Sequence, residues 1–151
     1  AKAKSAVQIV SIHWGTEYAL VANESQRALA RALIDVGADA IIGSHPHVVQ
    51  SIEEYRGAPI FYSLGNCIFD QYWNTDVQTG LSVAVSFEGN KVRYSLIPLS
   101  SIDAKSAPRP MNRIERLQFL DTLSARSEES LKDAIKEGEI IELFSPSKKS
   151  D

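Results

Sequence analysis

The chain has 151 residues, enough for one globular domain, and 44% of them are hydrophobic and 23% charged. Its net charge is −3 and no block of basic residues is present, which argues against a nucleic-acid-binding surface. No apolar run approaches the roughly 20 residues that span a bilayer, and the single cysteine, Cys67, excludes an internal disulfide.

The first part of the chain has the pattern of a strand–helix–strand unit. The β-branched run 7–12 predicts a buried strand. Asn23 or Ser25 can cap a helix whose apolar residues recur at helical spacing as far as Gly37. The run 39–43 predicts a second buried strand. Because the connections are short, we expect these two strands to be parallel and joined by a right-handed crossover.

The second part of the chain predicts strands first and helices later. The run 58–66 predicts a third strand. The alternating runs 81–87 and 91–99 flank a short Glu-Gly-Asn segment and predict an antiparallel hairpin. A first C-terminal helix is predicted from its apolar spacing, and a second helix should run from Ser127 to Gly138. The apolar positions of the first helix are Ile114, Leu117, Leu120 and Leu123.

All three histidines of the chain follow predicted strands. His13 follows the first strand, and His45 and His47 follow the second. Since neighbouring parallel strands end at the same edge of a sheet, these side chains should meet there. In extended backbone, which Pro46 favours at His45, residues two apart point to the same side. Neutral imidazoles bind Zn, Fe, Mn or Cu, so the pattern predicts a metal site.

The same residues also have purely structural interpretations. A lone histidine is more often hydrogen-bonded than metal-bound. Glu17 and Asp70 are candidate ligands or ligand supports, but solvated loop carboxylates have the same pattern. Asn66 follows Gly65, which is also typical of a turn. Cys67 is flanked by apolar residues, which favours a small buried side chain over a nucleophile.

Three motifs, read together and in this order, resemble a known family. They are "SIHWGTEY", "LIDVGADAIIGSHPHVVQ" and "IEEYRGAPIFYSLGNCIFDQ". They resemble the C-terminal half of the CapA family, which is named for poly-γ-glutamate capsule synthesis and belongs to the calcineurin-like metallophosphoesterase superfamily. The resemblance covers roughly residues 6–100.

The resemblance implies a fold and a set of site residues. The fold would be α/β, the C-terminal half of a four-layer αββα sandwich, with a parallel βαβ unit, an antiparallel hairpin and C-terminal helices. Residues 1–100 would form this half-domain, and 101–151 a linker, two helices and a frayed tail. The implied metal ligands are His13, His45 and His47, and the residues placed near them are Glu17, Asn66 and Asp70. Two divalent ions, of Mn, Fe or Zn, would be expected.

The resemblance also implies a partner. The superfamily supplies an Asp-x-His, a bridging Asp and an Asn-His from motifs upstream of the region matched here. We therefore expect the missing N-terminal half of the domain to complete the site, either as a separate chain or as a part removed from this one. An anchor outside this chain would hold the protein at the cell envelope, outside the cytoplasm.

Three functions are consistent with the sequence. The leading hypothesis is a metal-dependent phosphoester hydrolase, active when complete, in capsule or envelope polymer synthesis, with a phosphoester or a polymer as substrate. The alternative is a non-catalytic scaffold or polymer-binding module of an envelope assembly. The third is a structural α/β fragment whose histidines are only hydrogen-bonded.

Overall fold

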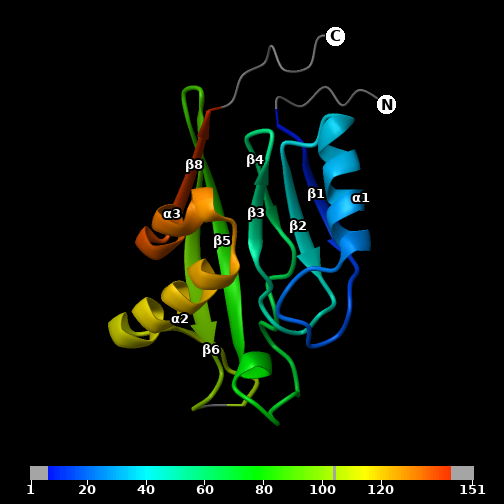
Figure 1. Cartoon of the computed structure of the whole chain (residues 1–151). Coiled ribbons are helices and arrows are strands. Elements are labelled where there is room, and N and C mark those ends of the chain that lie inside the picture. The colour runs from blue at the N-terminus through cyan, green and yellow to red at the C-terminus, as the bar shows by residue number, and fades with distance from the viewer. Residues whose placement is uncertain (1–6, 104, 144–151) are drawn as a thin grey trace.

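The computed structural model describes residues 7–103 and 105–143, which form two β-sheets and three α-helices (Figure 1). The tail predicted at the C-terminus lies outside the described residues. The first sheet has the order β1-β2-β4-β3. Its strands are β1 (Ile9–His13), β2 (Ala40–Ser44), β3 (Ile52–Tyr55) and β4 (Ala58–Phe61). In this sheet β1, β2 and β4 are parallel, and β3 is antiparallel to β4.

The predicted strand–helix–strand unit is present. Helix α1 (Glu24–Asp35) begins at Asn23, whose side chain accepts a hydrogen bond from the backbone N–H of Gln26. The Gln26 side chain in turn accepts from the Asn23 N–H, which completes a capping box. After α1 the chain turns at Gly37, where φ is +112°. Residues of α1 pack on one face of the first sheet, against Ile41 and Ile60 among others.

The third predicted strand is shorter than expected, and a strand before it was not predicted. The expected strand 58–66 is regular only as β4, which ends at Phe61. The unpredicted strand is β3, paired with β4 through a tight turn at Arg56 and Gly57, both at positive φ. Glu53 and Glu54 are not typical of a buried strand, because carboxylates are rarely buried.

The second sheet contains the predicted hairpin. Strands β5 (Thr79–Glu88) and β6 (Lys91–Ser100) pair from Thr79↔Ser100 to Glu88↔Lys91, which leaves a two-residue Gly-Asn turn. The unpredicted strands β7 (Arg109–Pro110) and β8 (Glu139–Leu143) both pair with β6. Phe87 near the end of β5 is 59% exposed, because the tip of the hairpin extends beyond the core.

The two sheets face each other across one core. Tyr94 of β6 contacts Phe61 of β4, with ring centroids 5.8 Å apart. Helices α2 (Arg113–Arg126) and α3 (Lys132–Glu137) contribute to the same core, and Gly138 ends α3 in the left-handed conformation, as predicted. A short 3-10 turn, Glu129–Leu131, connects them, and another, Asp76–Gln78, precedes β5. The fold is therefore α/β, with a mixed sheet, an antiparallel sheet and three helices.

The apolar face of α2 differs from the prediction. Leu120 and Leu123 are fully buried, but Ile114 and Leu117 are 69% and 52% exposed. Only the C-terminal half of α2 lies over the core, since the helix projects away from it toward its N-terminus (Figure 1). None of the helices in the described part of the chain has the length and apolar character needed to cross a membrane.

The unequal burial of two leucines on α2 gives the first prediction. Replacing buried Leu120 by alanine should lower the free energy of unfolding by about 2–5 kcal/mol, because it leaves a cavity. The same change at exposed Leu117 should alter it by about 0.5 kcal/mol or less. Urea denaturation of both variants measures the difference. Equal losses would contradict the described orientation of α2.

The N-terminus of α2 gives a pH-dependent prediction. Two hydrogen bonds from Arg109, supported by the backbone N–H of Asn112, lower the pKa of Glu115 to about 2. Because the pKa is depressed in the folded state, the stabilisation is present above the unfolded value of about 4.5 and is lost as the pH falls toward 2.

The Glu115→Gln variant isolates this contribution, because glutamine keeps the cap but not the charge. The variant should be less stable than the parent at neutral pH, and the difference should close below pH 4.5. Thermal unfolding across this pH range measures it. A stability difference that stays constant down to pH 2 would show that the ion pair has no role.

Candidate metal centre

The parallel pairing of β1 and β2 brings two histidine-bearing loops together. The register pairs His13 with Ser44, so both strands end at the same level, and His45 follows directly. The pairing continues into the loops, where Trp14 N–H donates to Ser44 O at 3.0 Å and Tyr18 N–H to Pro46 O at 2.8 Å. The prediction that these histidines lie at one sheet edge is confirmed.

The sequence suggested an extended backbone for the His-Pro-His segment, but the structure shows that the backbone is not extended. His45 has φ of +101° and His47 has φ of +62°, and Tyr18 in the facing loop also has φ of +62°. A left-handed backbone at non-glycine residues costs about 1–3 kcal/mol each. Buried Gln50 helps to hold this arrangement, since its side-chain amide donates to Ala19 O at 2.8 Å. The segment is thus a strained turn fixed by its neighbours.

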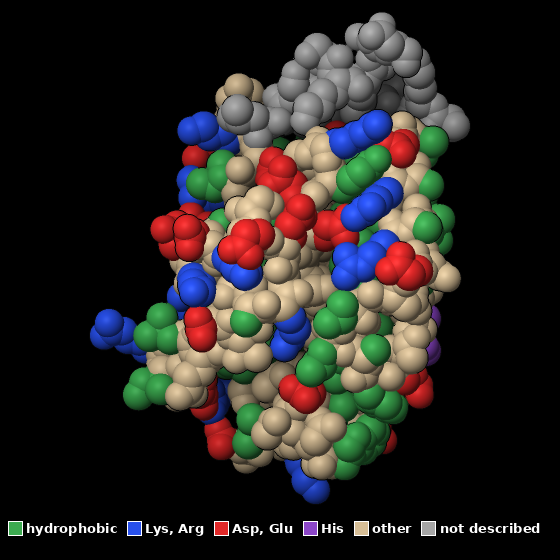
Figure 2. All heavy atoms as spheres, in the orientation of Figure 1, with side chains coloured by type: hydrophobic (Ala, Val, Ile, Leu, Met, Phe, Trp, Pro, Cys, Tyr) green, Lys and Arg blue, Asp and Glu red, His purple; other side chains and the backbone are tan. Residues whose placement is uncertain are grey.

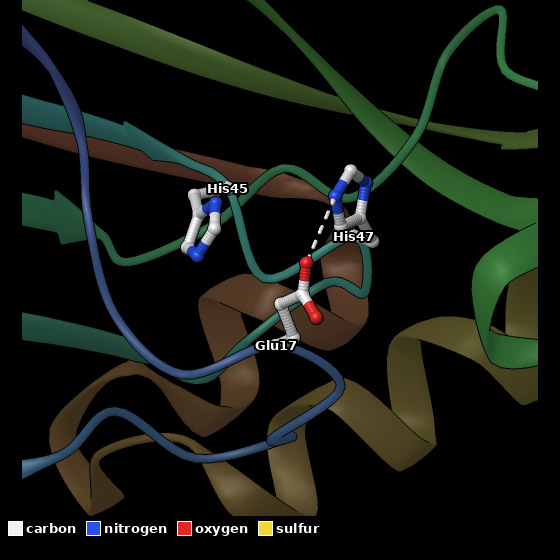
Figure 3. A group of neighbouring side chains, drawn as sticks. All are labelled: Glu17, His45 and His47. Carbon is white, nitrogen blue, oxygen red and sulfur yellow. Dashed lines mark ion pairs between the residues drawn. The ribbon is translucent and has the colours of Figure 1, made fainter.

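The turn places three metal-binding side chains around one point. Glu17, His45 and His47 each offer one ligand atom, and these atoms lie within 4.8 Å of one another. The Glu17 carboxylate points toward the His47 ring, 3.9 Å from Nε2, and His45 lies on the other side of this carboxylate (Figure 3). Ligands of a tetrahedral ion with bonds of about 2.0 Å are about 3.3 Å apart, so small side-chain rotations would close the group.

Asn66 fixes the orientation of His47. The Asn66 amide nitrogen donates to Val77 O at 3.0 Å and to the Gln71 side-chain oxygen at 3.1 Å. Its oxygen therefore faces Nδ1 of His47, at 3.0 Å. Since that oxygen can only accept, Nδ1 carries the proton in neutral His47, and Nε2 presents its lone pair toward Glu17. This is the arrangement that a metal-ligating histidine requires.

His13 lies beside the group rather than in it. Its ring centroid is 4.6 Å from that of His45, and its Nδ1 is 3.3 Å from Ser44 Oγ. The structure thus brings all three predicted histidines together. The compact donor group, however, combines two of them with Glu17, which the sequence left open as a ligand, a ligand support or a solvated carboxylate.

The remaining predicted residues differ in their surroundings. Asp70 is exposed and forms no hydrogen bond or ion pair with any described residue. Cys67 is exposed, so the interpretation as a buried hydrophobe was wrong, because the loop after β4 leaves the sheet before reaching it.

Aromatic side chains surround His47 on the solvent side. The ring of Tyr18 stacks over His47 with centroids 6.0 Å apart, and Phe69 lies 4.8 Å from it. Trp73 meets Tyr18 edge-on at 5.6 Å. Tyr18, Phe69 and Trp73 are all exposed. No local pattern predicts the place of Phe69 opposite His47, because it depends on how the loop after β4 folds back.

The donor set fits a divalent transition ion. Two neutral imidazoles and one carboxylate are the ligand types that Zn, Mn and Fe take in proteins. Among the described residues, this donor group includes a single carboxylate, that of Glu17. This edge of the sheet can therefore hold one ion with its own residues, with His13 as a further donor at the side.

The Asn66–His47 contact gives a spectroscopic prediction. In the parent protein, the nitrogen-15 shifts of His47 in its neutral form should report the proton on Nδ1. Asn66→Ala removes the acceptor, so the Nε2-protonated tautomer should become populated. Asp70→Asn, a change in the same loop without contacts, is the matched control and should leave the shifts unchanged. An unaltered tautomer in Asn66→Ala would show that Asn66 does not orient the ring.

Comparison with known proteins gives matches that cover this site. Residues 1–71 match the family model described as "Bacterial capsule synthesis protein PGA_cap". The chain is 38% identical over 127 residues to the PGA biosynthesis protein CapA of Bacillus subtilis, which covers 84% of this chain and 33% of that protein. It is 36% identical over 127 residues to the capsule biosynthesis protein CapA of Bacillus anthracis, covering 80% and 30%.

A more distant relative is the probable polyglutamine synthesis accessory protein MT0602 of Mycobacterium tuberculosis, 31% identical over 101 residues, covering 62% of this chain and 27% of that protein. The chain thus spans about one third of the length of the curated relatives it matches. It is therefore similar to a part of the bacterial capsule synthesis (CapA) proteins.

Proposed function

We propose that this chain carries one wall of the metal centre of a metal-dependent phosphoester hydrolase that acts in the synthesis of capsule or another envelope polymer. The observation that carries the proposal is the compact group of Glu17, His45 and His47 at the end of two parallel strands. Active-site residues of α/β proteins gather at this position. The relationship to capsule synthesis proteins supports the biological setting.

Each residue of the site has a role in the proposal. His45 and His47 would hold the ion through neutral imidazole nitrogens, and Glu17 would add a charged oxygen. Asn66 would keep Nε2 of His47 directed at the ion, and the strained turn would keep the two imidazoles from rotating away. A divalent ion held there would act as a Lewis acid on a phosphoester oxygen. His13, beside His45, is placed to bind a second ion of Mn, Fe or Zn.

The centre needs residues from elsewhere to hold two ions. We propose that they come from the missing N-terminal half of the domain, carried on the same protein or on a separate chain. Two observations support this. The matched part of this chain covers about one third of the length of the relatives, and β1 has a neighbour in the described sheet on one side only. Pairing along that free edge would complete a four-layer αββα sandwich of the metallophosphoesterase type.

The proposal also includes a place in the cell. Two relatives are named for PGA or capsule biosynthesis. We therefore place the complete protein at the cell envelope, outside the cytoplasm, held there by an anchor.

The exposed aromatic residues favour a second candidate function. Tyr18, Phe69 and Trp73 form an exposed rim around His47, and exposed apolar clusters of this kind mark binding surfaces. A non-catalytic module that binds polymer in an envelope assembly would use the same rim. The two functions differ in turnover: a generic phosphoester with added Mn or Zn should be hydrolysed by the complete protein only under the first.

Metal binding by this chain tests the proposal directly. We expect the chain to bind Zn²⁺ or Mn²⁺, and His45→Ala and His47→Ala to weaken binding by at least about tenfold each, because each removes a ligand. Glu17→Gln should weaken it as well. Isothermal titration calorimetry measures the affinity, and the metal content after dialysis gives an independent value.

Asp70→Asn is the matched control, because it removes an exposed carboxylate of a neighbouring loop that has no described contact. Its affinity should equal that of the parent. Unchanged metal binding in both histidine variants would exclude the metal role.

A further inference from the structure

A polar cleft lies away from the histidines, between α1, β3 and the C-terminal end of α2. Its volume is about 250 Å³. Figure 2 shows basic and acidic side chains interleaved on this face, between the regions occupied by α1 and α2, with histidine visible only at the margin. The cleft is lined by Arg27, Arg31, Ser51, Ile52, Glu53, Arg126, Ser127 and Glu128. None of these belongs to the candidate metal centre.

Glu53 forms the floor of one side of the cleft, and both of its carboxylate oxygens accept hydrogen bonds. It is buried, and its Oε2 accepts from Arg27 and from the Tyr62 hydroxyl at 2.8 and 2.9 Å. Its Oε1 accepts from Arg31 at 2.8 Å. One carboxylate therefore faces two guanidinium groups, which leaves this side with an excess of positive charge.

Arg126 on the opposite side has no carboxylate in ion-pair contact among the described residues. Its Nη2 donates to Val49 O at 2.8 Å, but its Nε is buried and has no hydrogen-bond partner in the described part of the protein. Burial lowers the pKa of Arg126, and the more distant charge of Asp76 opposes this effect. An arginine stays protonated in proteins, so a cation is held here without a counter-ion in contact.

Ser51 carries a second buried polar group of this kind. It is 4% exposed, and its hydroxyl has no hydrogen-bond partner among the described residues. Leaving a buried donor or acceptor without a partner costs about 1–3 kcal/mol per group. The two residues that carry these groups both line the same cleft, and native proteins rarely leave such groups without an ion or water.

We propose that this cleft is an oxyanion site that binds a carboxylate or a phosphate group between Arg126, Ser51 and the Arg27–Arg31 pair. An oxyanion accepts hydrogen bonds from both Nε of Arg126 and the Ser51 hydroxyl, and it balances the excess positive charge. The cleft is several times larger than the roughly 30 Å³ share of one water, so an anion fits.

The acidic residues of the cleft do not oppose this assignment. Glu53 is neutralised by its two arginines. Glu128 at the rim accepts from the backbone N–H of Glu54 at 2.6 Å. Three guanidinium groups against two carboxylates leave one net positive charge for the ligand. Water alone would satisfy the Ser51 hydroxyl but would leave this charge without a counter-ion.

Anion titration tests the proposal. We expect inorganic phosphate, acetate or both to bind saturably at constant ionic strength, followed by amide chemical shifts in residues 51–53 and 126–128. Binding of phosphate alone would identify a phosphate site, and binding of both anions would identify a site that also takes carboxylates. Arg126→Gln should weaken binding at least about tenfold, since it removes a charged donor.

Variants distinguish anion binding at this site from non-specific attraction of anions to positive charge. Ser51→Ala should also weaken the binding, and Arg113→Gln, at the exposed N-terminal end of the same helix, should not. Two results would overturn the proposal. One is the absence of saturable binding by either anion, which would leave water as the only occupant. The other is equal affinity in the parent, Arg126→Gln and Ser51→Ala proteins, with native-like spectra of each variant showing that it is folded.

Discussion

The parallel pairing of β1 with β2 is the interaction on which the candidate metal centre depends. Five consecutive residue pairs, ending at His13↔Ser44, fix the level at which both strands stop. A one-residue change in this register would turn every side chain of β1 to the other face of the sheet. The two loops that follow would then leave from different levels, and Glu17 would not reach His47. The backbone hydrogen bonds of the first sheet thus set the level from which both loops leave.

Strain in the His-Pro-His turn is a consequence of this pairing. Positive φ at His45 and His47 disfavours the folded backbone, so the turn needs support from its surroundings. That support comes from the hydrogen bond between Tyr18 and Pro46, from the buried Gln50 and from the contact of His47 with Asn66. Since these contacts join the turn to the loop with Tyr18 and to the loop with Asn66, three segments at this edge of the sheet set the geometry of the imidazoles. The backbone of the site is thus supported by its surroundings without an ion.

The packing at the β3 edge of the first sheet depends on a buried charge. Glu53 lies in a strand that is buried on the side of α1, where a lone carboxylate would be strongly destabilising. Two arginines on successive turns of α1 and the Tyr62 hydroxyl compensate it and tie helix to sheet. The same arginines then form one wall of the cleft that Arg126 closes from α2. One buried carboxylate thus links the packing of α1 to a concentration of positive charge at the surface.

Local sequence pattern was enough to predict several strands, a helix and a hairpin of this protein. Apolar runs, the Asn23 cap and the Gly-Asn turn identified β1, α1, β2 and the β5–β6 hairpin, because each of these is specified by residues close in sequence. The histidines were recognised because they follow strands. The sequence also gave the family resemblance that comparison with capsule synthesis proteins confirmed.

Tertiary structure alone decided the rest. Strand β3 was missed because its carboxylate is compensated by arginines more than twenty residues away, which no local pattern reveals. The exposure of Leu117, the position of Glu17 in the donor group and the lack of a described hydrogen-bond partner for Nε of Arg126 all depend on which elements pack together. Residue types and local spacing are properties of the chain, but burial and charge balance arise only when distant segments meet.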